Sequence, residues 1–238
     1  MKNSIECPNC GHKNNSIDRV CKNCHFYLRE KIANIDLWTT FWKMLETPRK
    51  AFQNIFFAEK KNYVFILLFV LSFKFCFNGL VLANITKKNI FVFDEFYFNL
   101  LLSFGYFFLF IFLFSLFYKL TSKIFGIYVR YKDSYTLFTY SLWPMIFAVV
   151  ILSLLQYALF GEFYFTFNPS PFIIKPFAAY VLLALEALTI LFTLYLAIWG
   201  IYVQTGYKIY AFVFGVIFIV LLHLAQYLLP FAPFAINL

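Results

Sequence analysis

The sequence contains few charged residues. Only 13% of its 238 residues are acidic or basic, whereas a soluble domain usually carries about 25%. Hydrophobic residues make up 63% of the chain, and aromatic residues make up 24%. A water-soluble fold of this length would have too few polar side chains to cover its apolar surface. We therefore expect lipid to be the solvent for most of the chain.

The sequence also lacks the short motifs with which common enzyme classes bind substrates or cofactors. It contains no P-loop, no HExxH pair, no GxSxG nucleophile turn and no glycine-rich dinucleotide-binding turn. No internal repeat is evident, although many transporters are built from repeats. We accordingly predict that the protein is not an enzyme, and the absence of a repeat argues against a transporter.

Long apolar stretches, by contrast, are abundant. A helix needs roughly 20 apolar residues to cross a bilayer core of about 30 Å. Backbone polar groups in lipid must be satisfied within the segment, which favours helices over isolated strands. The sequence therefore predicts an all-α polytopic membrane protein, in which residues 62–238 form a domain with five transmembrane helices. The expected spans are 62–84, 97–118, 136–160, 178–199 and 209–229.

The distribution of basic residues predicts how these spans are oriented. Sixteen lysines and arginines fall before the first span and in the loops after the second and fourth spans. Three fall on the other side: Lys87, Lys88 and Lys175. Because loops rich in lysine and arginine stay in the cytoplasm, we expect a cytoplasmic N-terminus and an external C-terminus.

Four cysteines stand in two CxxC pairs near the N-terminus: Cys7, Cys10, Cys21 and Cys24. Each pair places two thiolates on one tight turn, and two such turns supply the four-sulfur shell of a structural Zn²⁺ site. Disulfides are the alternative, but a cytoplasmic location argues against them because the cytoplasm is reducing. We therefore predict that residues 1–30 form a zinc ribbon. His12 and His25 are expected to be neighbours of the site rather than ligands.

Residues 31–61 carry apolar side chains at helical spacing. Trp38, Phe41 and Trp42 lie on one face of a predicted helix, and Thr47-Pro48 is a typical start for a second helix. Arg49 and Lys50 would meet anionic lipid headgroups. We predict a pair of amphipathic helices lying in the membrane interface, where tryptophan is enriched. The alternative is a soluble helical hairpin that packs on the cytoplasmic ends of the transmembrane helices.

The order of several loose motifs resembles the Yip-domain family. The run 42–52 (WKMLETPRKAF) before the first span resembles the start of that domain, and residues 131–144 resemble its middle section. The segment from Ile198 through Gly206 to Ala211 resembles its last cytoplasmic turn. The N-terminal CPNCG is similar to the zinc ribbons often fused to prokaryotic members. This resemblance implies five spans and a cytoplasmic N-terminus. The likeness to prokaryotic members implies the cytoplasmic (inner) membrane of a prokaryote. Eukaryotic members act in vesicle traffic with small GTPases, a role that we do not transfer to this chain.

Two ionisable residues lie inside predicted spans. Lys74 in the first span and Glu186 in the fourth lie roughly 15 Å and 12 Å from the outer ends of their helices, at 1.5 Å per residue. Similar depths allow an ion pair between them. Such a pair fixes the register of two helices, or it belongs to a functional pathway.

These observations favour an integral membrane scaffold or adaptor. Its zinc ribbon would dock a cytoplasmic protein, and its helices would anchor it in the lipid bilayer. The ribbon lacks a dense basic and aromatic stripe, which argues against nucleic acid as the partner. Oligomerisation stays open. The alternative function is that of a small transporter, channel or lipid-binding membrane protein that uses the region of Lys74 and Glu186.

Overall fold

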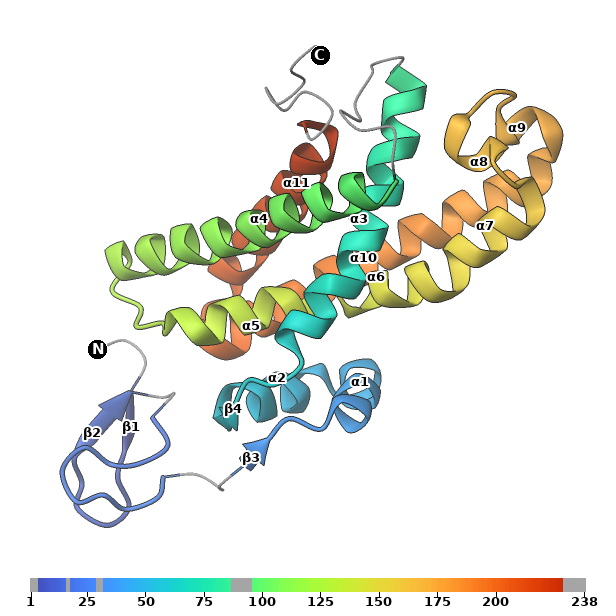
Figure 1. Cartoon of the computed structure of the whole chain (residues 1–238). Coiled ribbons are helices and arrows are strands. Elements are labelled where there is room, and N and C mark those ends of the chain that lie inside the picture. The colour runs from blue at the N-terminus through green and yellow to red at the C-terminus, as the bar shows by residue number, and fades with distance from the viewer. Residues whose placement is uncertain (1–3, 16–17, 29–31, 87–95, 229–238) are drawn as a thin grey trace. The chain divides into compact units, whose positions relative to one another are not determined.

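The computed structural model describes residues 4–15, 18–28, 32–86 and 96–228 (Figure 1). Its contacts divide the chain into two compact units. The first unit comprises Met1–Val64, Phe112–Ser141 and Tyr195–Val216, and the second comprises Phe65–Ile111, Leu142–Leu194 and Ile217–Leu238. The predicted orientation used Lys87 and Lys88 in its charge count and placed the C-terminus outside. These residues and the C-terminus lie outside the described residues.

The N-terminal ribbon is a small β-structure in the first unit. Strand β1 (Ser4–Glu6) pairs in antiparallel fashion with β2 (Lys13–Asn15), so that Ser4 faces Asn15. A second turn is closed by an isolated antiparallel bridge between Val20 and Tyr27. So few residues cannot bury an apolar core, and a bound metal is the usual source of stability for such a domain.

Two helices follow, as the sequence predicted. Helix α1 (Leu37–Glu46) is capped by Asp36, whose side chain accepts a 2.8 Å hydrogen bond from the Thr39 amide. Helix α2 (Pro48–Phe57) begins at Pro48, a residue that suits the first helical position. The two helices connect β3 (Ile32–Asn34) to the parallel strand β4 (Ala58–Lys60). This parallel strand pair was not predicted.

Five helices among the described residues are long and apolar enough to cross a membrane, which confirms the predicted fold class. The first is α3 (Val64–Thr86), and the second is formed by Tyr97–Ile124 of α4 (Phe96–Ile124). The third covers Tyr131–Phe160, and the last two are α10 (Pro176–Thr205) and α11 (Lys208–Leu228). Helices α4, α10 and α11 contribute residues to both units.

Several spans are longer than the sequence predicted. The second extends to Ile124 instead of 118, and the third begins at Tyr131 instead of 136. The added turns contain Lys119, Lys123 and Lys132, which had been assigned to a loop. Lysine is a good helix former, and its long stem can carry the ammonium group from a helix end to the headgroups. The first charged residue therefore ends the apolar run, but the helix continues beyond it.

The third span is interrupted near Pro144. Helix α5 (Tyr131–Ser141) ends before Leu142, and α6 (Trp143–Phe147) begins with Pro144 in its first turn. A proline at that position has no backbone N–H to donate, so it breaks the helical hydrogen-bond ladder. A π-helical turn (Ala148–Leu152) then leads into α7 (Ser153–Phe160). A π-turn holds one extra residue, which rotates the face of the following helix by about 100°.

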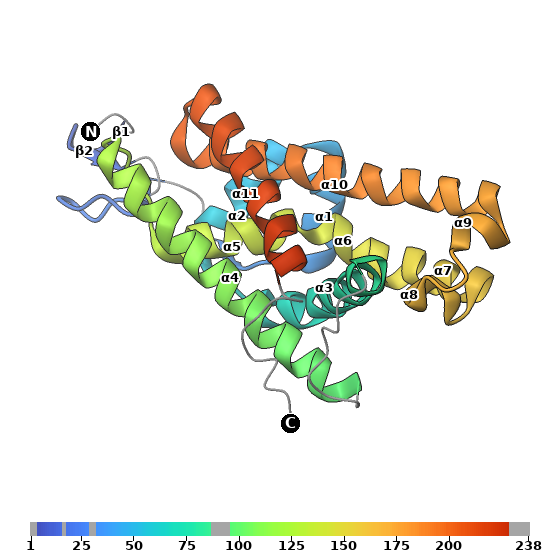
Figure 2. The same cartoon turned by 90° about the horizontal axis from the view of Figure 1, so that it is seen from above.

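Each unit has its own core. In the first unit a methyl group added at Gly200 of α10 would lie 2.9 Å from Leu137 of α5 and 3.0 Å from Phe52 of α2, so these three helices meet closely there. In the second unit residues of the third span and α10 form a buried cluster of Ala148, Leu152, Phe160, Ala179 and Leu182. The short helices α8 (Phe163–Thr166) and α9 (Pro171–Ile174) lie at the ends of α7 and α10 (Figures 1 and 2).

Candidate metal centre and buried ionic sites

Two turns of the same construction carry the four cysteines. In the first turn the Cys7 amide donates to the His12 carbonyl, and the Gly11 amide donates to the Cys7 carbonyl. In the second turn the amides of Cys21 and His25 make the equivalent bonds to Phe26 and Cys21. Gly11 has a φ of 69° and His25 a φ of 59°, so both turns reverse through left-handed backbone.

The turns bring the four sulfur atoms together. All four lie within 4.8 Å of one another, and the Cys7–Cys24 and Cys10–Cys21 sulfur pairs are each 3.6 Å apart. A tetrahedral shell with metal–sulfur bonds of about 2.3 Å requires sulfur–sulfur distances of about 3.8 Å. The arrangement therefore fits one metal ion held by four thiolates. His12 and His25 are exposed and do not belong to this group, in agreement with the sequence interpretation.

Asn14 holds the two cysteine turns through hydrogen bonds, a role that was not predicted from the sequence. Its buried side chain donates a 3.4 Å hydrogen bond to the Cys21 sulfur and a 2.9 Å bond to the His12 carbonyl. Its Oδ1 accepts a 2.9 Å bond from the Lys22 amide. One side chain thus holds both turns. Asparagine is common in short loops, so its identity carried no signal before the fold was known.

The hydrogen bonds around Cys21 shift the pKa of its thiol. Burial raises its pKa, but hydrogen bonds from the Cys24 and Asn23 amides outweigh that effect and lower the pKa to about 5. The thiolate is the form that binds metal. The hydrogen bonds of this turn therefore favour the form of Cys21 that binds a metal.

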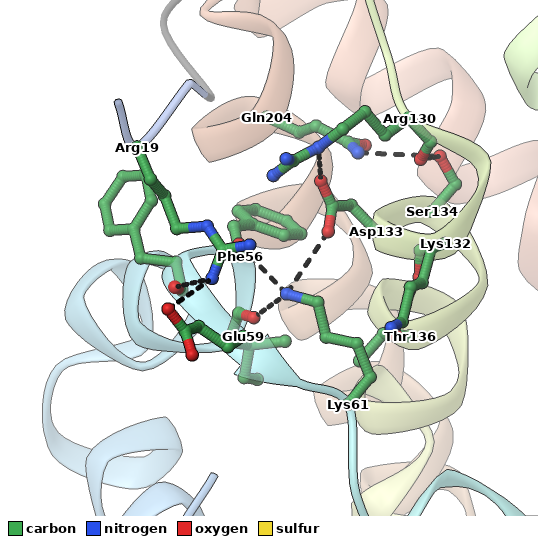
Figure 3. A network of polar contacts seen from close by, with 12 residues as sticks. Arg19, Phe56, Glu59, Lys61, Arg130, Lys132, Asp133, Ser134, Thr136 and Gln204 are labelled. Carbon is green, nitrogen blue, oxygen red and sulfur yellow. Dashed lines mark hydrogen bonds and ion pairs between the residues drawn. The ribbon is translucent and has the colours of Figure 1, made fainter. Parts of the chain in front are cut away.

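The ribbon contacts β4 through Arg19 (Figure 3). Its Nη1 lies 3.8 Å from Glu59 Oε1 and donates a 3.5 Å hydrogen bond to the Phe57 carbonyl at the end of α2. These contacts lie within the first unit. They attach the four-cysteine cluster to the segment that enters the first span.

A buried ionic network lies next to this contact (Figure 3). Lys61 Nζ is 3.2 Å from Asp133 Oδ1, and the two side chains are only 6% and 2% exposed. Asp133 Oδ2 also accepts a 2.7 Å hydrogen bond from Arg130 Nε. Lys61 further donates to the carbonyls of Ile55 and Phe56 in the last turn of α2. The network joins α2 to α5, and the sequence analysis did not foresee it.

Burial shifts the pKa of Lys61. Removal from water lowers its pKa to about 8, although the attraction of Asp133 opposes the change. The ammonium form still dominates at pH 7. Lys61 thus carries a charge inside the first unit that is compensated by Asp133.

The predicted interfacial face of α1 is exposed. Trp38, Trp42 and Leu45 are 71%, 50% and 48% exposed, while Thr40 and Met44 are buried on the other side of the helix. Trp38 and Trp42 form an edge-to-face pair with centroids 5.9 Å apart. Phe41 is partly buried between these faces. The geometry leaves a tryptophan face available for lipid, and lipid contact itself stays a prediction.

Helix α2 differs from the expectation of an interfacial pair. Its apolar side chains Ala51, Phe52, Ile55 and Phe56 are at most 3% exposed, because they pack inside the first unit. The apolar face of α2 therefore packs against protein, with Phe52 next to Leu137 of α5 and Gly200 of α10. Arg49 and Lys50 project from its exposed side. Periodicity identified the apolar face but could not say whether protein or lipid covers it.

The structure brings Lys74 and Glu186 together in the second unit. Lys74 Nζ donates to Glu186 Oε1, and the side chains are 4% and 17% exposed. Gln156 of α7 donates a 2.8 Å hydrogen bond to the same oxygen, so three spans meet at this carboxylate. The predicted pair of Lys74 and Glu186 did not include Gln156. The π-turn Ala148–Leu152 before α7 changes the helix face on which Gln156 lies, and an apolar run does not reveal such a turn.

Comparison of the chain with models of known protein families, with functionally curated proteins and with solved structures found no match. The resemblance to the Yip domain therefore stays a prediction.

Proposed function

We propose that this protein is a membrane-anchored adaptor whose zinc ribbon docks a protein partner. The observation that carries the proposal is the surface beside the four-cysteine cluster. Phe26 and Tyr27 directly follow the second turn and are 45% and 56% exposed. Exposed aromatic side chains on a small polar domain are typical of protein interfaces.

Zinc is the metal that suits this centre best. Four thiolates in tetrahedral arrangement are typical of structural zinc, and they leave no coordination position for substrate. The ion would hold the two turns in place and so position Phe26 and Tyr27. Such an ion supports binding rather than catalysis. The ribbon sequence lacks a dense basic and aromatic stripe, so we propose a protein partner rather than nucleic acid.

The proposed orientation places the ribbon in the cytoplasm of a prokaryote, with the helices in the cytoplasmic membrane. The excess of basic residues on the ribbon side supports this orientation. The exposed tryptophans of α1 and the basic side chains of Arg49 and Lys50 would meet the inner leaflet. Arg19 would then hold the ribbon close to the membrane surface, where a captured partner would be concentrated.

Crosslinking and mass spectrometry on native membranes test the adaptor. We compare the wild type with Phe26→Ser/Tyr27→Ser, which leaves the four thiols intact, and with Cys7→Ser/Cys10→Ser, which removes half of the shell. The matched control is Lys13→Ser on the exposed face of β2. A defined partner that is lost in both double variants and kept in the control supports the proposal. Identical partners in all four proteins would refute it.

A second candidate function is transport of a small solute or ion. The observation that favours it is the Lys74–Glu186 pair, because ionisable groups within membrane spans often lie on translocation pathways. Flux into proteoliposomes that is lost in Glu186→Gln would support transport. A flux equal to that of empty liposomes would leave the pair with a structural role only.

A further inference from the structure

The second unit contains a cavity beside the Glu186 carboxylate. Its volume is about 310 Å³, and its walls come from α3, from α7 to α9 and from α10. This volume lies at the lower end of the range typical of small-molecule sites, which is about 300–1,000 Å³. It has room for one chain of a lipid but not for a complete two-chain phospholipid.

Most of the cavity wall is apolar. Val81 of α3, Phe160 of α7 and Leu182 of α10 line it, and the α8–α9 segment adds Phe167 and Phe172. Two hydrogen bonds to the backbone hold this segment and its neighbours. Asn84 Nδ2 donates to the Phe165 carbonyl at 2.8 Å, and Lys175 Nζ donates to the Leu159 carbonyl at 3.1 Å. The chamber is therefore built by several elements and is not a shallow gap along one helix.

One end of the cavity is polar but carries no net charge. Glu186 lines it, and its negative charge is compensated by Lys74. Gln156 also lines it, with its Nε2 donating to Glu186. Gln156 is only 1% exposed. Its Oε1 accepts no hydrogen bond from the described part of the chain. A buried acceptor of this kind costs free energy until a donor reaches it.

We propose that this cavity binds a neutral single-chain lipid that carries a hydroxyl group. The hydroxyl donates a hydrogen bond to Gln156 Oε1, and the hydrocarbon chain lies between the aromatic side chains. An anionic head would enter the cavity without a counter-charge, because Lys74 is already paired with Glu186. A cationic head would have to compete with Lys74, which already neutralises that carboxylate. The site is independent of the adaptor role of the ribbon.

Photolabelling with a defined probe tests this site. The full chain is reconstituted in nanodiscs and irradiated with a diazirine-bearing dodecan-1-ol, and labelled peptides are identified by mass spectrometry. Unlabelled dodecan-1-ol, dodecane and dodecanoate serve as competitors at equal membrane concentration. We expect labels on α7–α10 and about fivefold better competition by the alcohol than by the alkane, the effect of one hydrogen bond. Equal competition by alcohol and alkane would overturn the proposed recognition of a hydroxyl.

Two sets of variants locate the binding. Ala179→Phe fills the cavity from α10, and Ala179→Leu is a milder replacement in case the first does not fold. The control is Leu188→Phe, which changes a side chain on the same helix that is 58% exposed and does not line the cavity. We expect labelling to fall at least fivefold in the Ala179 variants and to persist in the control. Undiminished labelling in a folded Ala179 variant would show that the lipid binds elsewhere.

Gln156→Leu tests the contribution of the hydrogen bond apart from that of the apolar walls. It removes the acceptor and keeps a similar side-chain volume. We expect the preference for dodecan-1-ol over dodecane to disappear. A preference that persists in this variant would contradict the role of Gln156. Partner binding through the ribbon is measured in parallel and should not change, so a failure of this proposal and a failure of the adaptor proposal can be told apart.

Discussion

Lys61 Nζ lies 3.2 Å from Asp133 Oδ1, and both side chains are almost completely buried. The contact joins the end of the ribbon-bearing segment to the start of the third span. Arg130 holds the second oxygen of the same carboxylate. A buried charge that loses its partner is strongly destabilising, so this small network should matter for folding.

Removal of the carboxylate should therefore be costly. Asp133→Asn leaves Lys61 and Arg130 close together without compensation, and we expect a loss of about 3–5 kcal/mol in the free energy of unfolding. Lys61→Met should cost less, because Asp133 keeps Arg130. Thermal or denaturant unfolding in detergent measures both. The control is Lys13→Met, whose ion pair with Glu6 is exposed. A loss in Asp133→Asn no larger than in this control would contradict the expectation.

The lowered pKa of Lys61 predicts a pH dependence. Its pKa is about 8 in the folded chain against an ordinary value of 10.5, so between these values the unfolded state binds more protons. The contribution of Lys61 to stability should therefore rise as the pH increases from 8 to about 10.5. Subtracting the curve of Lys61→Met removes the other titrating groups. A difference curve that falls or stays flat in this window would be inconsistent with a buried Lys61.

The Lys74–Glu186 pair calls for a double-mutant cycle. Glu186→Gln leaves the Lys74 ammonium buried without a counter-charge, and we expect a loss of about 3 kcal/mol or more. Adding Lys74→Met removes that stranded charge and should recover much of the stability. Unfolding in detergent gives the four free energies of the cycle. Simply additive losses would show that the two residues do not interact.

Removal of the metal should unfold the ribbon and leave the helices intact. We expect one zinc ion per chain by elemental analysis, and its loss in Cys7→Ser/Cys10→Ser without a change in helical circular dichroism. Asn14→Ala should weaken metal affinity by about 10- to 100-fold, as is usual for groups that orient ligands. Lys13→Ala on the same strand is the control. Unchanged affinity in Asn14→Ala would argue against a supporting role for its bond to Cys21.

Gly200 tests the packing of α10 in the first unit. A methyl group there would lie 2.9 Å from Leu137 and 3.0 Å from Phe52, so we expect Gly200→Ala to cost about 1–3 kcal/mol. Gly105 in α4 is the matched control, since a methyl group there meets nothing within 4 Å. Gly105→Ala should be neutral or slightly stabilising, because alanine favours helix. Equal effects of the two substitutions on unfolding would contradict the close approach.

Composition and local spacing were sufficient for the features that depend on nearby residues. Long apolar runs predicted the five helices, and two CxxC turns predicted the cluster of four thiols. The positions of Lys74 and Glu186 along their helices also indicated similar depths in the membrane. Span ends were less accurate, because Lys119, Lys123 and Lys132 continue helices that hydropathy alone would have ended.

Other features depend on contacts between distant segments. The apolar face of α2 was visible in the sequence, but only the fold shows that helix α5 and Gly200 cover it instead of lipid. The pairing of Lys61 with Asp133 could not be predicted. Lys61 was assigned to the juxtamembrane segment 31–61 and Asp133 to the loop before the third span, and no local spacing relates two such segments. Gln156 reaches Glu186 after a π-turn whose extra residue cannot be read from an apolar run.

The sequence by itself determined which segments prefer lipid and where a metal shell can form, because both follow from side-chain chemistry at short spacing. The tertiary structure decided which buried polar groups are compensated: Asp133 by Lys61 and Arg130, and Glu186 by Lys74 and Gln156. It also decided where an acceptor, Gln156 Oε1, faces a cavity. Burial removes competing water, so the free energy of such groups depends on the partners that the fold brings within hydrogen-bond distance.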